Sequence, residues 1–314
     1  MSAVMAATVN DHTSDIKLVD AASGESFPRA RFGSVILSSA ASRWHGITVE
    51  RHRRGVEELQ EHYVVGHGLA ISTARHSIPF GWKDGGKWRD GVWNPGEFHL
   101  VTHGAFNTPR WMDTLDELSL VLDRQFVADL VRDGLPSERI EFAPQRFALD
   151  ATIGRYAEAF RWELANDSPN GVLYADTLTV GFALHLLSNY SVAKPKLPVP
   201  RGKLNSLQLH TVIDFIHAHL DADVSIPALA EQARVSAFHF ARQFRATVGL
   251  PPHQYVLRQR IQKSLRLLKA GKLPLAQIAV ESGFHDQAHF TRAFRRLLGT
   301  TPRASRLDGG NPRD

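Results

Sequence analysis

The sequence predicts an α+β fold in which a strand-rich first part is followed by an all-helical last third. Between Ser34 and Leu122, apolar stretches are short, often alternate with polar residues and are interrupted by frequent glycines, which is typical of a β-sandwich or barrel. After residue 203, apolar residues recur at intervals of three and four, which indicates amphipathic helices. One stretch of these helices also repeats at an offset of 50 residues.

The composition of the 314 residues indicates a globular protein, since 43% are hydrophobic and 22% are charged. The absence of cysteine excludes disulfides, thiolate metal sites and cysteine nucleophiles, and it suits a reducing cytoplasm. No apolar run reaches the roughly 18 residues of a membrane-spanning helix, and residues 1–17 lack the basic-then-apolar order of a signal peptide. We therefore expect a cytoplasmic protein without a membrane partner.

Helices are expected to end the strand-rich part. A brief helix is predicted over 124–133, and two longer segments, 150–166 and 173–190, show helical spacing. These two form a predicted helical pair at about residues 151–190. The pair has more apolar surface than one face of a barrel covers, so we expect it to join two chains in a homodimer. Residues 1–191 are thus predicted to be one domain for sensing or dimerisation.

A linker is predicted over 192–203, which reads VAKPKLPVPRGK. Its three prolines and one glycine prevent a helix or a central strand from running through it. Residues 204–306 are then expected to form a second domain, followed by a tail over 307–314. Within the second domain, long amphipathic helices are predicted over 209–220 and 254–270.

The repeat lies between and after these long helices. The segment His239–Arg245 recurs as His289–Arg295. A glycine and a proline follow each copy at the same spacing: Gly249 and Pro252, then Gly299 and Pro302. A short helical segment precedes each copy, at 227–233 and at 274–282. Each unit therefore reads as a helix, a short turn and a second helix, which begins after Ser236 or Asp286 as its N-cap.

The second helix of each unit is predicted to bury one face and to expose the other. Phenylalanines four residues apart are expected to anchor it in the core: Phe240, Phe244, Phe290 and Phe294. Small residues are expected to let the helices of each unit approach closely: Ala230, Ala233, Ala279 and Gly283. The exposed face is basic, since residues 203–306 contain 15 Lys or Arg and six Asp or Glu, whereas the rest of the chain has a net charge of −4.

Such a face is suited to double-stranded DNA, although charge alone is equally typical of a solvated surface without a partner. Arginine offers guanine a two-donor fork, and glutamine pairs with adenine. Two such helices in one rigid body would reach major-groove segments about 34 Å apart. Arg242 and Arg292 are the expected base contacts. Phosphate contacts are expected from Arg245, Arg258, Arg295 and Arg296. The other expected DNA contacts are Ser236, Ala237, Phe238, His239, Asp286, Gln287, His289 and Thr291.

The region from about Leu207 to Arg306 resembles the DNA-binding domain of the AraC/XylS family of transcription regulators. The second unit carries the family's most specific signature, from Ile278-Ala279 through Gly283 to Pro302. The resemblance implies a monomeric seven-helix domain with two helix-turn-helix units, which usually activates transcription by contacting RNA polymerase. One departure is Ser305, which stands before the final arginine where the family often has an aromatic residue.

Residues 95–107, PGEFHLVTHGAFN, resemble the second conserved motif of cupin barrels, which also form the effector domains of many AraC-type regulators. Asn107 stands where metal-binding cupins have a histidine ligand, and asparagine is a poor ligand for the usual divalent ions. Upstream, His62 and His67 lack the expected His-x-His spacing. We therefore expect a cupin-like domain without a catalytic residue, a metal or a cofactor.

Tryptophans crowd this domain and are expected either to line a small-molecule pocket or to fill the barrel. The candidate effector-binding residues are Arg43, His67, Trp82, Trp93 and His99.

Together these patterns predict a sequence-specific transcription regulator, not an enzyme. It is expected to act as an activator that responds to a small-molecule effector, with DNA and RNA polymerase as partners. The alternatives are a cupin-type enzyme with a helical appendage and an architectural DNA binder without sequence preference.

Overall fold

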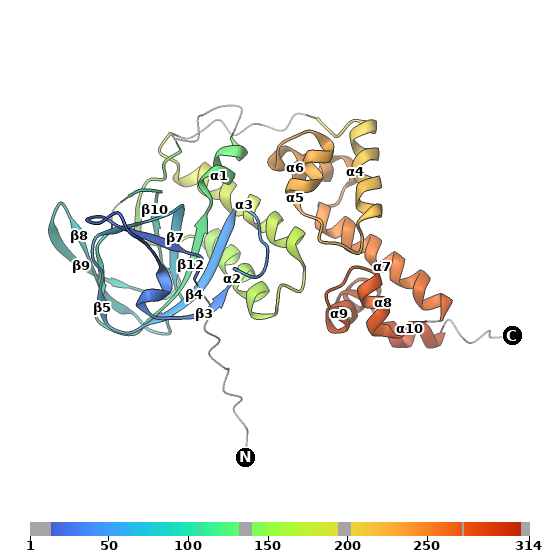
Figure 1. Ribbon diagram of the computed structural model, residues 1–314, viewed down its shortest axis with the longest axis horizontal. Helices are drawn as coiled ribbons and strands as arrows, with labels where there is room; N and C mark the ends of the chain where they lie inside the picture. Colours follow the sequence, from blue (N-terminus) through green and yellow to red (C-terminus); the bar gives the residue numbers. More distant parts are fainter. Residues whose placement is uncertain (1–13, 106, 132–139, 194–201, 272, 309–314) are drawn as a thin grey trace, which may run out of the picture. The chain divides into compact units, whose positions relative to one another are not determined.

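The computed structural model describes residues 14–105, 107–131, 140–193, 202–271 and 273–308. Contacts between residues divide the chain into two compact units, one of Met1–Asp167 with Gly181–Pro198 and the other of Ser168–Val180 with Val199–Asp314. The strands lie in the first unit and helices α4 to α10 in the second (Figure 1). Most of the predicted linker lies outside the described residues. No helix of the described chain has both the length and the apolar character needed to cross a bilayer.

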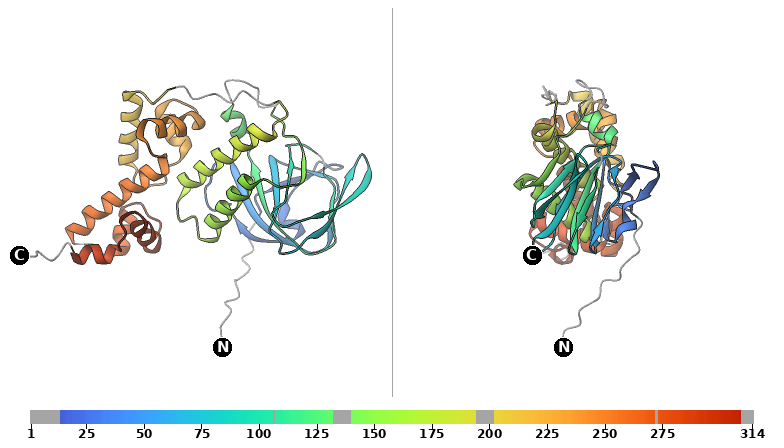
Figure 2. Two further views of the ribbon diagram at one scale, coloured as in Figure 1. Left: turned by 180° about the vertical axis from the view of Figure 1, so that it is seen from behind. Right: turned by 90° about the vertical axis from the view of Figure 1, so that its left-hand side faces the viewer.

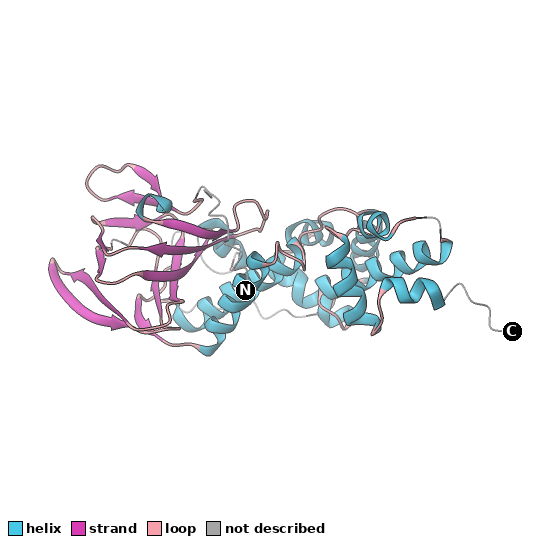
Figure 3. Cartoon of the chain, turned by 90° about the horizontal axis from the view of Figure 1, so that it is seen from below, coloured by secondary structure: helices cyan, strands magenta, loops and turns pink. Residues whose placement is uncertain are grey.

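The first unit contains three antiparallel sheets, drawn magenta in Figure 3. The largest has the order β13-β10-β7-β12-β4-β3 and consists of β3 (Ser34–Ser38), β4 (Ile47–Arg54), β7 (His67–Ser72), β10 (Phe98–Val101), β12 (Leu115–Leu122) and β13 (Gln145–Ala148). The second has the order β5-β11-β8-β9, with β5 (Glu57–Glu58), β8 (Ile78–Asp84), β9 (Lys87–Trp93) and β11 (Pro109–Trp111). The third, β2-β1-β6, pairs β1 (Lys17–Asp20) with β2 (Ser26–Pro28) and β6 (His62–Val64), and the 3-10 helix η1 (Arg29–Phe32) follows β2.

Strand β12 lies at the centre of the largest sheet and is buried on both faces. It pairs with β4 along its whole length and with β7 over six residues. Alternate side chains line an interior cavity: Leu115, Glu117, Ser119 and Val121. The side chains between them point to the opposite face, as the two-residue period of a strand requires, and helix α2 (Ala151–Ala165) contacts this strand. The predicted strand-rich first part is thereby confirmed.

The predicted helices of the first unit are confirmed to within a few residues. Helix α1 is Arg124–Leu130, and α2 is followed by α3 (Val172–Tyr190), whose residues from Gly181 onward belong to the first unit and pack against α2 (Figure 2, left). The Asp150 side chain caps α2 by accepting from the Thr152 and Ile153 N–H groups. The same carboxylate accepts from the Tyr190 hydroxyl at 2.9 Å, so the start of α2 is tied to the end of α3.

The packing of α3 removes the reason for which a dimer was expected. Phe182 is fully buried and its ring contacts those of Tyr156 and Phe160, at 5.8 and 6.1 Å between centroids. Leu186 and Leu187 are buried as well. These apolar side chains are therefore covered within one chain, because α2 supplies contacts that a second chain was expected to supply.

The second unit contains the seven helices that the family resemblance implies within residues 202–308. They are α4 (Ser206–Ala218), α5 (Ile226–Ala233), α6 (Ala237–Val248), α7 (Pro252–Ala270), α8 (Leu275–Glu281), α9 (Gln287–Leu298) and α10 (Pro302–Asp308). Prolines at the first turns of α7 and α10 and glycines after α6 and α9 set these boundaries, because proline fits a helix start and glycine adopts the left-handed cap.

Candidate nucleic-acid interface

Two helix-turn-helix units are present, α5 with α6 and α8 with α9. Their first helices end in the same way. The Val235 N–H donates to the Ala230 carbonyl at 3.0 Å, and the Phe284 N–H donates to the Ala279 carbonyl at 2.9 Å. These equivalent bonds close the helix ends and direct the chain into the second helix.

The turn residue with a positive φ differs between the two helix-turn-helix units. It is Arg234 in the first, at φ 54°, and Gly283 in the second, at φ 86°. A Cβ atom on Gly283 would lie 1.9 Å from the carbonyl oxygen of Leu220, just beyond α4. Only glycine therefore fits the second turn, whereas the first turn exposes its arginine.

Arg260 on α7 also contacts the segment between α4 and α5, where the second turn packs against the Leu220 carbonyl. We refer to this contact as the junction at Leu220. Its Nε donates to the Leu220 carbonyl at 2.9 Å and its Nη2 to the Ala222 carbonyl at 2.8 Å. The second turn and Arg260 thus meet the same backbone oxygen, in the segment between α4 and α5. This role of Arg260 was not predicted, because an arginine on an amphipathic helix is usually solvated.

The second helices are anchored as predicted. The four phenylalanines at the repeated positions are fully buried: Phe240, Phe244, Phe290 and Phe294. Within each helix the two rings lie 5.5 Å apart between centroids. The small residues Ala230, Ala233 and Ala279 are buried as well. This confirms the predicted inward face of both helices.

Both predicted N-caps are formed. The Ser236 hydroxyl accepts from the His239 N–H at 3.4 Å, and the Asp286 carboxylate accepts from the His289 N–H at 2.6 Å. The second bond lowers the pKa of Asp286. Both caps therefore orient the first turn of a recognition helix.

The arginines of α6 and α9 are exposed, as expected from the anchored inward face. They are Arg242 and Arg245 on α6, and Arg292, Arg295 and Arg296 on α9. Gln287 is exposed, while Ala237, His239 and Thr291 are half-buried. The side chain of Phe238 lies outside the described part of the chain.

His289 was expected to contact DNA from the edge of the exposed face, but it is buried. It is 7% exposed, and its ring meets that of Phe284 edge to face at 5.2 Å. Burial, together with the positive charge of Arg260, lowers its pKa to about 4. The neutral ring packs in the core of the second unit because it sits beside Phe290 on the inward side of the helix.

The predicted effector residues fall into two groups. Trp93 and His99 line the interior cavity of the first unit. Arg43, His67 and Trp82 are not among its lining residues. Arg43 lies in the loop between β3 and β4, and the His67 ring accepts from the His103 N–H at 3.3 Å. The cavity instead contains Arg29, Arg54 and Glu117, which strand alternation alone did not identify.

Trp82 belongs to an aromatic cluster beside this cavity. Its ring lies 5.5 Å from that of Phe147 and under the Arg146 guanidinium, at 5.2 Å. Within the described residues, no three His, Asp or Glu side chains gather as metal ligands.

The buried histidines of the first unit predict acid sensitivity. Burial lowers the pKa of His62 and of His67 to about 4 and that of His99 to about 3, from 6.5. The unfolded chain binds these protons below pH 6.5 and the folded chain does not. The free energy of unfolding is therefore highest above pH 6.5. It falls as the pH drops, by roughly 1 to 2 kcal/mol per histidine at pH 5.

Tryptophan fluorescence measures this effect selectively, because all six tryptophans precede residue 168. The urea midpoint of this signal is expected to be lower at pH 5 than at pH 7. His99→Phe should reduce the difference, and His76→Gln should not, since His76 is 60% exposed. Equal midpoints at the two pH values for the unchanged chain would contradict the prediction.

Comparison with known proteins finds a family model within the second unit and relatives with longer alignments. A family model described as a helix-turn-helix domain matches residues 229–307. A probable transcriptional regulator, LumQ of Photobacterium leiognathi, is 28% identical over 162 residues, which are 52% of this chain and 62% of that protein. A putative AraC-like transcription regulator of Streptomyces antibioticus is 31% identical over 157 residues, which cover 47% of this chain and 51% of that protein.

The chain thus spans between half and two thirds of these two relatives. Among solved structures, the DNA-binding domain of AdpA in complex with a target DNA is 31% identical, with 33% of this chain and 93% of that chain covered and a TM-score of 0.32.

Proposed function

Because the chain belongs to the AraC/XylS family of transcription regulators, we propose that it regulates transcription by binding a defined DNA sequence through α6 and α9. The observation that carries this proposal is the repeated pair of exposed arginines above buried phenylalanines. Arg242 and Arg245 stand on α6 at the positions that Arg292 and Arg295 occupy on α9.

The proposed division of labour follows from the chemistry of the side chains. Arg242 and Arg292 are assigned to base edges, where a guanidinium donates two hydrogen bonds to guanine. Gln287 is assigned to adenine, and Arg245, Arg258, Arg295 and Arg296 to phosphates, which fix position without reading sequence. Ser236 and Asp286 contribute by capping α6 and α9.

Arg292→Ala is expected to weaken binding to the target site by about 1 to 3 kcal/mol and to relax the preference at one base pair. The target is first obtained by selecting bound sites from random DNA with the full chain. Affinity is then measured on the selected site, on its single-base variants and on random DNA.

Arg295→Ala is the matched comparison on the same helix. It should weaken binding to all sequences alike. It should also reduce the slope of the logarithm of the binding constant against the logarithm of the salt concentration by about one, as expected of a phosphate contact. If Arg292→Ala behaved in the same way, its assignment to a base would be wrong. If selection enriched no sequence, the chain would be an architectural binder.

For the remainder of the chain we propose a cupin-like effector domain over 1–191, a linker over 192–203 and a DNA-binding domain over 204–306, which contacts RNA polymerase as an activator. The curved sheets around one interior cavity support the first part of this assignment. The relatives named above are described as regulators, so no enzymatic activity is proposed.

A homodimer is retained as a proposal, with the exposed part of α2 as its contact, where Trp162 is 45% exposed. Sedimentation of the full chain at micromolar concentration tests it, and a monomer there would contradict it.

A further inference from the structure

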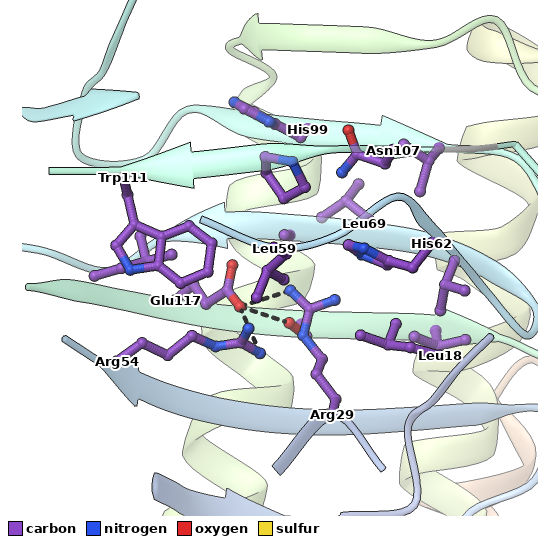
Figure 4. Close-up of a pocket in the computed structure, with 18 of the residues that line it drawn as sticks. Leu18, Arg29, Arg54, Leu59, His62, Leu69, His99, Asn107, Trp111 and Glu117 are labelled. Carbon is purple, nitrogen blue, oxygen red and sulfur yellow. Dashed lines mark hydrogen bonds and ion pairs between the residues drawn. The ribbon is translucent and has the colours of Figure 1, made fainter. Parts of the chain in front are cut away.

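The interior cavity of the first unit encloses two arginines and one glutamate (Figure 4). Arg29 belongs to η1, Arg54 is the last residue of β4, and Glu117 is the third residue of β12. Arg29 Nη2 donates to Glu117 Oε1 at 2.6 Å, and Arg54 Nη2 lies 3.4 Å from the same oxygen. Both guanidiniums therefore share one carboxylate.

The charges that line this cavity do not balance. The two lining histidines, His62 and His99, are neutral at pH 7, because burial lowers their pKa values to about 4 and about 3. Glu50 and Glu57 attract Arg54 from outside the lining. Among the described residues that line the cavity, one positive charge is thus without a counter-ion, and burying an unpaired charge is costly.

Some guanidinium nitrogens also lack hydrogen-bond acceptors. Arg54 is 2% exposed, and its Nε and Nη2 have no hydrogen-bond partner within the described part of the chain. The same holds for Arg29 Nε. The ring of Trp111, 5.6 Å from the Arg54 guanidinium, attracts its charge but does not replace an oxygen acceptor. Because buried donors are nearly always paired, these nitrogens indicate a ligand that brings an anionic acceptor.

The rest of the lining is apolar and the space is small. Leu18, Leu59 and Leu69 supply walls from different strands or loops, and Phe80 and Trp93 supply aromatic surface. The cavity volume is about 70 Å³, and a volume of roughly 15 Å³ holds one water molecule. The cavity therefore suits a compact ligand.

We propose that this cavity binds a small monocarboxylate with a compact apolar body, held by Arg54 and Arg29. Two guanidiniums and two carboxylates then form a neutral set. The inference rests on the proposed effector role of the first unit and specifies the chemical class of its ligand.

The test uses the full chain and a panel of acids with matched amides. Benzoate, cyclohexanecarboxylate and isovalerate are titrated against benzamide, cyclohexanecarboxamide and isovaleramide. Binding is followed by tryptophan fluorescence, since Trp93 and Trp111 line the cavity, and by the urea midpoint of the same signal. At least one acid is expected to shift both readouts and to bind at least about tenfold more tightly than its amide. If no acid shifts either readout, or if the amides bind equally well, the proposal is overturned.

Variants locate the site. Arg54→Gln should weaken acid binding at least about tenfold and leave amide binding unchanged, and Arg54→Lys should recover part of the loss. Arg51→Gln is the matched control, because Arg51 lies on the same strand but pairs with Asp116 outside the cavity. If Arg54→Gln fails to fold, Ala70→Leu fills the cavity and keeps its charges, and it should abolish binding. Unchanged binding in the folded variant would overturn the proposal.

DNA binding is measured in parallel on the selected site. Specific DNA binding without any acid binding would reject this inference alone. Acid binding without specific DNA binding would support the carboxylate site and reject the proposed regulatory function.

Discussion

Gly283→Ala is expected to destabilise the second unit by at least about 3 kcal/mol. The added Cβ would lie 1.9 Å from the Leu220 carbonyl oxygen and 2.8 Å from Arg260 Nε. The oxygen belongs to the backbone, so it cannot move aside without displacing the end of α4. The backbone at Gly283 also has a φ of 86°, which an alanine adopts with strain.

Gly299→Ala and Gly249→Ala separate the two contributions. Both glycines have a similar positive φ, at 75° and 81°, and a Cβ on either would meet nothing within 4 Å. They are expected to cost about 1 kcal/mol each. Hydrogen exchange in α8 and α9 measures the opening free energy of the second unit in the full chain. An equal loss in all three variants would show that the contact with Leu220 contributes nothing.

Glu117→Gln is expected to destabilise the first unit by about 3 to 5 kcal/mol, because it leaves two buried guanidiniums without a carboxylate. The urea dependence of tryptophan fluorescence measures it. Asp116→Asn is the matched control on the neighbouring residue of β12, whose partner Arg51 is partly exposed. Its expected loss is about 1 kcal/mol. If both variants lowered the free energy of unfolding equally, burial would not be the reason for the larger effect expected at Glu117.

The effect of Glu117→Gln should also depend on pH. Burial alone favours the neutral acid, but Arg29 and Arg54 lower the pKa of Glu117 to about 2 from 4.5. The stabilisation by this carboxylate is therefore complete above pH 4.5 and is lost as the pH falls toward 2. The difference between the two proteins should shrink over this window, and a constant difference would contradict the ion-pair explanation.

The helical unit was predictable because its signals are local. Periodic apolar residues, capping residues and the repeat identify the helices from α4 to α9 without knowledge of what they contact, whereas α10 was implied only by the family resemblance. His289 shows the limit, since periodicity placed it at the edge of a face whereas the contact with Phe284 buries it. Arg260 and Gly283 act on a carbonyl more than 35 residues away in sequence, and no local pattern reveals such a contact.

The strand-rich unit was predictable only in class. Alternation indicates strands but not which strands pair, so β1 and β2 were not expected before Ser34. The ion cluster joins η1, β4 and β12, which come together only through sheet pairing. Trp93 and His99 were proposed because tryptophans and a few polar groups are typical of a small-molecule pocket, whereas Arg54 looks in sequence like one of several solvated arginines.

The junction at Leu220 has a consequence for the geometry of any operator. Because the Leu220 carbonyl packs directly against Gly283, the two helix-turn-helix units have no hinge at this point. Inserting one base pair between two recognised segments rotates them by about 34° relative to each other. A rigid pair of helix-turn-helix units cannot follow that rotation, so the DNA would have to twist before both segments could be bound.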